Sequence, residues 1–239
     1  GLGSVCAREF AGLGARLVIA GRNVEKLEDL RQAFPDPDSH KIFAGDLTSP
    51  EICQDLVNQA IEFLGGLDVI IHVAGGGYGF RDPLLTWDQL NTLFQVNIAS
   101  AAEINRFAIP EMVKRQSGYV VHVGSVASQE ATASVGYNTV KSALAAYVRS
   151  LGGELASAGV IVTGILPGAF YAPGNSWRRL EANKPEVVQG FIQKNLPRKK
   201  IAGAEEIVPL ILFLASDSAS MMSGSCVPID AGEGKAYAV

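Results

Sequence analysis

Two hydrophobic patterns alternate along the chain. Short apolar runs rich in β-branched residues predict strands that are buried on both faces. Longer amphipathic stretches, with apolar positions three or four residues apart, predict helices. The predicted strands are Arg16–Ala20, Lys41–Ala44, Val69–Val73, Tyr119–Val123, Val160–Leu166 and Cys226–Ile229, and the predicted helices are Ser4–Leu13, Val24–Ala33, Pro50–Leu64, Trp87–Arg115, Val135–Ala158 and Glu205–Ala215. The alternation indicates an α/β protein with a doubly wound parallel sheet and helices on both faces.

One segment, residues 170–198, breaks this alternation. It carries three prolines and a tryptophan among basic residues. A long irregular insert after the end of a strand is typical of a lid over a substrate, and the alternative is a helical excursion packed on the surface. No linker or internal repeat divides the rest of the chain, so residues 1–239 are expected to form a single domain.

Local signals refine the long helix Trp87–Arg115. Thr86 and Gln89 fit a capping box that opens it. Pro110 lies inside it and predicts a kink or break there, because proline removes a backbone donor.

The composition narrows the class of protein. A net charge of −4 and a pI of about 5.4 argue against a general nucleic-acid binder. No apolar run approaches the ~20 residues of a membrane span, and no signal-peptide pattern opens the chain. The three cysteines, Cys6, Cys53 and Cys226, lack metal-ligand spacing. We therefore expect a cytoplasmic protein with no metal, nucleic-acid or membrane partner, whose cysteines are small buried hydrophobes.

Tyr137 and Lys141 are the strongest candidates for chemistry. Four residues is about one helical turn, so both side chains project from the same helix face. An ammonium beside a phenol lowers the pKa of the phenol, which suits proton transfer to a carbonyl or from an alcohol. The pair alone is weak evidence, because this spacing is common on solvated faces. Ser125 strengthens it by ending a strand where ligands bind in parallel sheets, and Ser128 is a nearby competitor.

Six motifs in order resemble the short-chain dehydrogenase/reductase family across nearly the whole chain. They are Gly1-Leu2-Gly3, the strand ending His72-Val73-Ala74-Gly75, Asn97, Ser125, the pair Tyr137 and Lys141, and a closing stretch with Gly224, Ser225, Asp230 and Gly232. The resemblance is nearest to the 3-oxoacyl reductases, and it implies a three-layer Rossmann fold. It also implies a catalytic tetrad of Asn97, Ser125, Tyr137 and Lys141.

The chain departs from the family pattern at several positions. His72 and Val73 replace two asparagines, and Ala172 stands where a threonine is usual. We interpret His72, like His40 and His122, as a hydrogen-bonded structural residue, and we leave all three out of the site.

The resemblance implies a dinucleotide site at the carboxyl ends of the strands. Gly1 and Gly3, ahead of a helix, fit a pyrophosphate turn. An acidic residue at the end of the strand Arg16–Ala20 would bind the ribose hydroxyls of NAD, and none is present. Arg22 is placed to pair with the 2′-phosphate of NADP(H), so the sequence favours that cofactor. The alternative is that Arg22 is an ordinary surface arginine. Asp46, with Leu47 beside it, resembles the adenine contact, and the alternative is a helix cap. The remaining cofactor residues by resemblance are Ala74, Gly75, Tyr137, Lys141, Pro167 and Gly168.

The first residues lie in the middle of the glycine motif. In the family a central strand feeds this turn, so we expect a gap in the sheet and an N-terminally incomplete chain.

Together these features predict an oxidoreductase that moves a hydride between NADP(H) and a carbonyl or secondary alcohol. The alternative is a non-catalytic NADP(H)-binding sensor or scaffold of the same fold. Apolar residues beyond one face of the two longest helices predict a homodimer or homotetramer. The residues that carry this expectation are Ile98, Ala99, Ala101, Ala102, Ile104, Ala143, Ala145, Ala146 and Val148.

Overall fold

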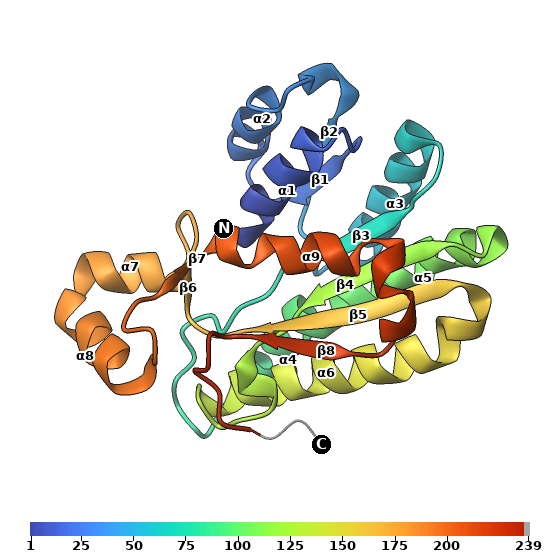
Figure 1. Ribbon diagram of the computed structural model, residues 1–239. Helices are drawn as coiled ribbons and strands as arrows, with labels where there is room; N and C mark the ends of the chain where they lie inside the picture. The colour runs from blue at the N-terminus through green and yellow to red at the C-terminus, as the bar shows by residue number, and fades with distance from the viewer. Residues whose placement is uncertain (237–239) are drawn as a thin grey trace.

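The structure, a computed structural model, describes residues 1–236 and has three layers (Figure 1). All described strand pairs are parallel. The main sheet has the order β3 (Val69–His72), β4 (Gly118–Val123), β5 (Val160–Pro167) and β8 (Cys226–Ile229), and a second sheet pairs β1 (Val18–Gly21) with β2 (Lys41–Ala44). The prediction of a parallel α/β fold is confirmed, with strand bounds that differ by no more than two residues at either end.

Helices cover both faces of the main sheet because successive strand residues point to opposite sides. Val120 and Val162 pack with α3 (Pro50–Leu64), α5 (Ser100–Arg115) and α6 (Val135–Leu155). Val121 and Ile165 pack with α1 (Leu2–Gly12) and α9 (Val208–Leu214) on the other side. The helix α2 (Val24–Gln32) packs on the second sheet, against β1 and β2.

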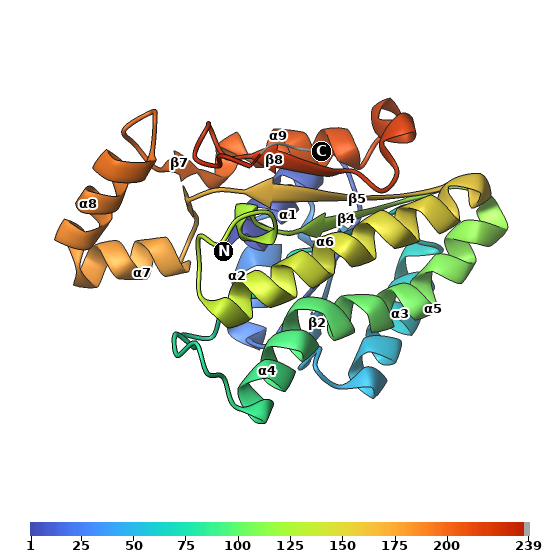
Figure 2. The same cartoon turned by 90° about the horizontal axis from the view of Figure 1, so that it is seen from below.

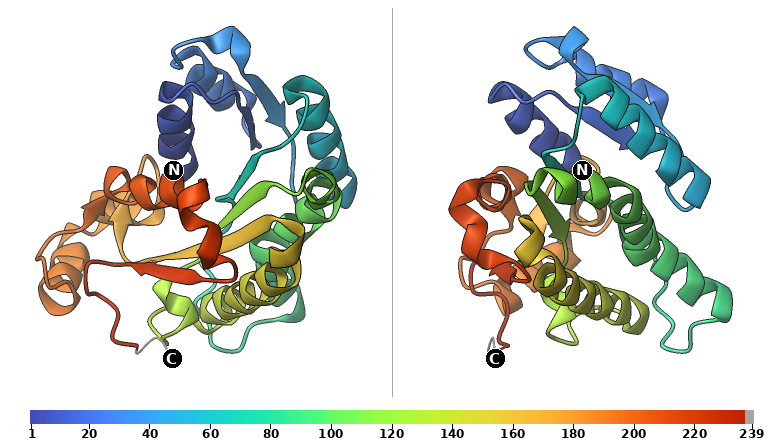
Figure 3. Two further views of the ribbon diagram at one scale, coloured as in Figure 1. Left: turned by 45° about the vertical axis from the view of Figure 1, so that its right-hand side comes forward. Right: turned by 90° about the vertical axis from the view of Figure 1, so that its right-hand side faces the viewer.

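A gap separates β1 from β3. Within residues 1–236, β1 pairs only with β2 and β3 pairs only with β4, so the edges of both strands lack a neighbour on the other side. A cavity of about 1070 Å³ lies between them, lined by Leu17–Gly21 from one edge and Val69–Ala74 from the other. Figure 3 shows the two sheets as separate blocks. The expected gap is therefore present, and the incompleteness of the chain stays a prediction.

The segment after β5 is helical, not irregular. It begins with β6 (Phe170–Tyr171), continues through α7 (Ser176–Asn183) and α8 (Pro185–Asn195), and returns to β7 (Ala202–Gly203), which pairs with β6. Figure 2 shows the two helices projecting beyond one end of the main sheet. Their core is separate and consists of Val188, Ile192, Leu196 and Ile201. The prolines of this segment had indicated an irregular insert. Pro185 instead stands at the first position of α8, where proline is compatible with a helix.

The long helix predicted for Trp87–Arg115 is interrupted at a different place from the one expected. It consists of α4 (Trp87–Phe94), one π-helical segment (Gln95–Ala99) and α5, which runs through Pro110 without a break. The capping box is confirmed: the Gln89 N–H donates to Thr86 Oγ1 at 3.3 Å, and the Thr86 N–H donates to Gln89 Oε1 at 3.0 Å.

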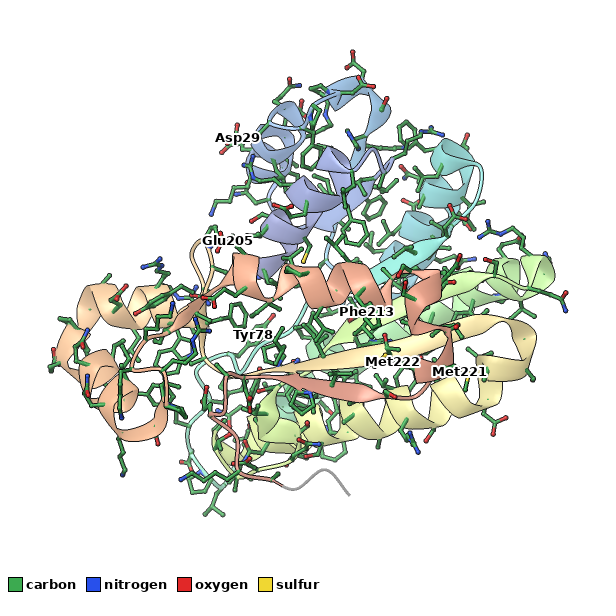
Figure 4. All side chains as sticks on the ribbon, in the orientation of Figure 1. Asp29, Tyr78, Glu205, Phe213, Met221 and Met222 are labelled. Atoms are coloured by element: carbon green, nitrogen blue, oxygen red, sulfur yellow. The ribbon has the colours of Figure 1, made fainter. Side chains whose placement is uncertain are left out.

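The apolar surplus on the long helices is smaller than expected. Ala101, Ile104 and Val148 are buried in the core of the single chain, so they cannot serve an interface. Large apolar side chains are exposed instead at Leu84 and Trp87 around the start of α4, at Phe94 at its end and at Val135 at the start of α6. Phe213 and Met221 are exposed as well (Figure 4). Across residues 1–236, no helix combines the length and apolar character that a membrane crossing requires.

Candidate active site

Tyr137 and Lys141 lie one turn apart near the start of α6, as the sequence predicts. The Lys141 Nζ is 5.6 Å from the centre of the Tyr137 ring. It donates a hydrogen bond to the carbonyl oxygen of Val123, the last residue of β4, at 3.0 Å. Lys141 is buried, so this carbonyl fixes the ammonium at the carboxyl end of the sheet.

The electrostatics differ from the expectation of a tyrosine with a lowered pKa. Burial raises the pKa of Tyr137, and a hydrogen bond with the Ser125 side chain opposes part of that shift. Burial also lowers the pKa of Lys141 to about 8, because water no longer solvates the ammonium. The expected direction was wrong for the protein alone because the effect of burial on the phenol exceeds that of the Ser125 hydrogen bond. Tyr137 is therefore a protonated phenol at neutral pH.

Of the two candidate serines, Ser125 is the one whose side chain faces Tyr137. Ser125 follows β4 and caps the 3-10 turn Val126–Ser128, where its Oγ accepts from the Ala127 N–H at 3.2 Å. Its side chain also lies close enough to Tyr137 to lower the pKa of the phenol. The Ser128 hydroxyl turns back and donates to the Ser125 carbonyl at 2.8 Å. The structure thus separates the two candidates that the sequence left close together.

Asn97 joins the same site from the π-helical segment. Its Oδ1 accepts from the Gly76 N–H at 3.0 Å, and its Nδ2 donates to the carbonyls of Gly76 at 3.0 Å and Leu93 at 2.9 Å. Gly75 is required here, since a Cβ would lie 2.7 Å from Asn97 Oδ1 and 3.3 Å from Lys141 Nζ, at a φ of +155°. The amide therefore clamps the loop after β3 against the lysine.

Five of the predicted cofactor residues line the cavity between β1 and β3: Gly1, Gly3, Arg22, Leu47 and Ala74. Gly1 caps the start of α1, whose free N–H groups face outward from the helix end. Arg22 follows β1 and is exposed. Asp46 lies close enough for Arg22 to help lower its pKa, although the larger causes are hydrogen bonds from the Thr48 N–H and hydroxyl. Asp46 therefore does not cap α3, whose N-cap is Ser49, and its contact with the adenine stays a prediction.

Pro167 and Gly168 end β5 beside a carboxylate that the sequence analysis missed. The Oε2 of Glu233 accepts from the Ala169 N–H at 2.6 Å, and burial raises the pKa of this carboxyl. A Cβ at Gly168 would lie 2.4 Å from that oxygen. Ala172 is buried against α9 and offers no hydroxyl. The sequence signal for Glu233 was its spacing from Asp230 after β8. That spacing was not interpreted as part of a site, because acidic residues near a chain end are usually solvated.

The arrangement fits a dinucleotide whose nicotinamide end reaches Tyr137. A free helix start, an exposed arginine and loops made of glycine lie along one side of the carboxyl ends of the strands. The polar side chains that meet at the end of that path are those of Ser125, Tyr137, Lys141 and Asn97. Among the described residues, no cluster of histidine, cysteine and acidic side chains has the geometry of a metal site.

Known proteins are similar to the chain over nearly its whole length. Residues 1–233 match the family described as enoyl-(acyl carrier protein) reductase. An uncharacterized oxidoreductase of Staphylococcus aureus strain USA300 is 32% identical over 169 residues, which are 70% of this chain and 73% of that protein.

Two solved structures resemble it as well. A 3-oxoacyl (acyl-carrier-protein) reductase of Agrobacterium tumefaciens C58 with NADP bound is 26% identical, with a TM-score of 0.87 over 97% of this chain and 90% of that one. Levodione reductase is 26% identical, with a TM-score of 0.90 over 99% and 95%. With the family match and the Ser125, Tyr137 and Lys141 site in a three-layer Rossmann fold, the chain belongs to the short-chain dehydrogenase/reductase family of oxidoreductases.

Proposed function

We propose that the protein is an NADP(H)-dependent reductase of ketones or aldehydes, running in reverse as a secondary-alcohol dehydrogenase. The observation that carries the proposal is the meeting of Tyr137, Ser125 and Lys141 at the carboxyl end of β4. Tyr137 is a protonated phenol at neutral pH and can donate a proton, which supports the reductive direction.

Each side chain has one task at the reacting carbonyl. NADPH, when bound, supplies the hydride. Tyr137 donates its phenolic proton to the carbonyl oxygen, and Ser125 donates a hydrogen bond to the same oxygen as negative charge develops there. Lys141 holds a positive charge next to the phenol and stabilises the phenolate that remains. Asn97 keeps the loop of Gly75 and Gly76 against Lys141.

The cofactor would lie across the residues that the sequence analysis singled out. Gly1 and Gly3 suit the pyrophosphate, Asp46 and Leu47 the adenine, and Arg22 the 2′-phosphate. Ala74, Gly75, Lys141, Pro167 and Gly168 suit the nicotinamide half. The similar reductase of Agrobacterium tumefaciens holds NADP, which supports this choice over NAD.

Two further features complete the proposal. Residues 1–239 act as one domain in which α7 and α8 cover the substrate as a lid. The apolar side chains exposed around the starts of α4 and α6 support a homodimer or homotetramer, which light scattering measures.

Replacing Tyr137 with Phe is the decisive test. The variant loses the proton donor and keeps the ring, so kcat for ketone reduction should fall by about 10³-fold or more while the Kd for NADPH stays within about twofold. A panel of ketones with NADPH, followed by absorbance, measures both proteins. Retained turnover in the variant would exclude Tyr137 as the acid. Tight NADPH binding by the wild type with no turnover on any ketone would favour the sensor instead.

A further inference from the structure

A polar cluster of four side chains lies next to Lys141, and two of them, Asn105 and His122, are buried. His72 of β3 and His122 of β4 are paired in register, and their rings stack with centroids 4.5 Å apart and planes 20° apart. Asn105 of α5 and Tyr147 of α6 complete the cluster. No catalytic step proposed above uses any of these four residues.

Asn105 connects the other three side chains. Its Oδ1 faces the His72 Nε2 at 2.8 Å, so His72 donates there. Its Nδ2 donates to the Tyr147 hydroxyl oxygen at 3.1 Å and faces the His122 Nε2 at 3.4 Å. The oxygen and the nitrogen of the Asn105 amide are therefore both engaged. The Nε2 atoms of His72 and His122, which face this amide, must each have a defined protonation state. This arrangement requires His72 to carry its hydrogen on Nε2 and His122 to leave Nε2 free as an acceptor.

Stability alone does not explain the imidazole at position 122. Its Nδ1 is buried and has no hydrogen-bond partner within residues 1–236. An orphaned polar atom of this kind destabilises a fold, whereas an apolar side chain of similar size would not. A feature that costs stability and sits under a reaction site points to a role in that site.

The four elements that the cluster joins are the ones that carry the site. β3 leads into Gly75 and Gly76, which bond to Asn97, and α5 follows the π-helical segment that holds Asn97. β4 supplies the Val123 carbonyl, one residue beyond His122, to which Lys141 donates. α6 carries both Tyr137 and Lys141 on the turns before Tyr147. A shift between any two of these elements would change the distance between Lys141, Tyr137 and the loop after β3.

We propose that His72, Asn105, His122 and Tyr147 form a positioning cluster that holds β3, β4, α5 and α6 in the arrangement hydride transfer needs, and that it works only while both imidazoles are uncharged. This role rests on the proposed reductase function for its kinetic consequence. The four residues are positioning residues, because they act through Lys141, Tyr137 and Asn97 and touch neither substrate nor cofactor.

The surroundings keep both rings uncharged. The groups that face them are each other's rings, Lys141 and Tyr147 from α6, Asn105 from α5 and the backbone of Gly164 from β5. His72 also borders the cavity between β1 and β3. Burial lowers the pKa of His72 to about 4. Burial, the neighbouring imidazole and the Lys141 ammonium lower the pKa of His122 well below its usual value. A proton on His122 Nε2 would place a donor against the Asn105 amide donor and break the connection between α5 and β4.

The first experiment observes the cluster without turnover. The chain has three histidines, so the imidazole nitrogens of the ¹⁵N-labelled protein can be assigned by NMR from single variants. His72 should show an Nε2–H tautomer and His122 an Nδ1–H tautomer, and neither ring should titrate between pH 8 and 5.5. Titration of either ring near pH 6.5 in the folded protein would overturn the proposal, whatever the enzyme reduces.

The second experiment measures the consequence for the reaction. Glutamine presents an amide near the position of the histidine Nε2 and does not titrate in this range. His122→Leu should lower kcat about tenfold across the pH range with the KM for NADPH within about twofold. His122→Gln should recover most of that loss and extend the acid limb of the kcat profile to lower pH. His40→Asn is the control, since His40 only accepts from the Leu17 N–H far from the site, and it should change neither quantity.

The outcomes separate the two proposals. If the wild type reduces no ketone, the reductase function fails, and the NMR tautomers still decide whether the cluster is uncharged. Acid unfolding of the wild-type protein adds a check. Each cluster histidine binds a proton near pH 6.5 in the unfolded protein but not in the folded one, so the stability of the fold decreases as the pH falls below that value. His122→Gln should move the acid midpoint of unfolding lower by about half a pH unit. An active wild type whose His122→Leu variant keeps full kcat would show that the cluster does not position the site.

Discussion

The catalytic and cofactor sides of the site are built in different ways. On the catalytic side, Asn97 and Lys141 are 2% and 3% exposed, and each is fixed by hydrogen bonds to backbone carbonyls. On the cofactor side, the Arg22 side chain is exposed and makes no hydrogen bond or ion pair within residues 1–236, while the Asp46 side chain bonds only to nearby Thr48. The first side is preorganised by the fold, and the second offers charge to a ligand that completes it. Substitutions on the catalytic side should therefore change kcat, and those on the cofactor side should change affinity.

Lys141→Met should give the largest effect among the tests of this comparison. Loss of the ammonium beside Tyr137 should lower kcat by about 10³-fold. The variant should nevertheless be more stable at pH 7, because a buried cation without a counter-charge is removed. The pKa of Lys141 falls from 10.5 to about 8, and a shift of that size corresponds to roughly 3 kcal/mol, part of which the lost hydrogen bond to Val123 offsets.

The pH dependence gives the sign of this effect. Between pH 8 and 10.5 the unfolded lysine still binds a proton that the folded one has released, so the wild type gains stability as pH rises through that window. The stability advantage of Lys141→Met should therefore shrink above about pH 8. Thermal unfolding measured from pH 7 to 10 checks this, with the exposed Lys114→Met as the control. A Lys141→Met variant less stable than the wild type at pH 7 would mean that the lysine supports the fold as well as the chemistry.

Ser125→Ala should lower kcat by about 10²-fold, since it removes one donor to the developing oxyanion. Ser128→Ala is a closely matched control three residues away, because its hydroxyl bonds only to the Ser125 carbonyl. It should keep kcat within about threefold. Steady-state rates on one ketone with saturating NADPH measure both. Equal losses in the two variants would indicate that the turn, not the Ser125 hydroxyl, matters.

Arg22→Ala tests the cofactor side. It should weaken NADPH binding by about 10- to 100-fold, because a charge-assisted contact contributes about 1.5–3 kcal/mol, and leave NADH binding nearly unchanged. Arg8→Ala, on the exposed part of α1, is the control. Binding titrations of the wild type and both variants with NADPH and NADH, followed by nicotinamide fluorescence, give the six constants. The kcat of Arg22→Ala with saturating NADPH should stay near the wild-type value. An equal loss of affinity for NADPH and NADH would show that Arg22 does not contact the 2′-phosphate.

The two sides also differ in how well the sequence predicts them. The strands, the Tyr137 and Lys141 pair and the position of Ser125 follow from local patterns, because each depends on spacing within one element and the end of the strand beside it. A kink or break was predicted at Pro110, and the helix is interrupted instead by the π-helical segment Gln95–Ala99. The Asn97 amide in that segment bonds to Gly76, 21 residues away, and no local pattern reports such a contact.

Burial was the second source of error. A Tyr–Lys spacing indicates attraction between the two groups but carries no information on how far both are removed from water, so the direction of the Tyr137 pKa shift was wrong. The apolar residues assigned to an interface include several that the single chain buries. Glu233 and Asn105 were missed for a related reason, because their partners lie 64 residues away at Ala169 and 42 away at Tyr147.

Asp46→Asn should give the smallest effect and sharpens the assignment of the cofactor side. An asparagine keeps the oxygen that accepts from the Thr48 N–H and hydroxyl, so the turn and the thermal stability should not change. It removes a carboxylate that attracts Arg22. With that competing charge gone, the preference for NADPH over NADH should rise by about two- to threefold, which is the scale of an exposed charge pair. The preference should return to the wild-type value at 0.5 M salt, where the Debye length is shorter. Unchanged preference at low salt would mean that Asp46 does not compete for Arg22, and a fall in affinity for both cofactors alike would identify it as an adenine contact.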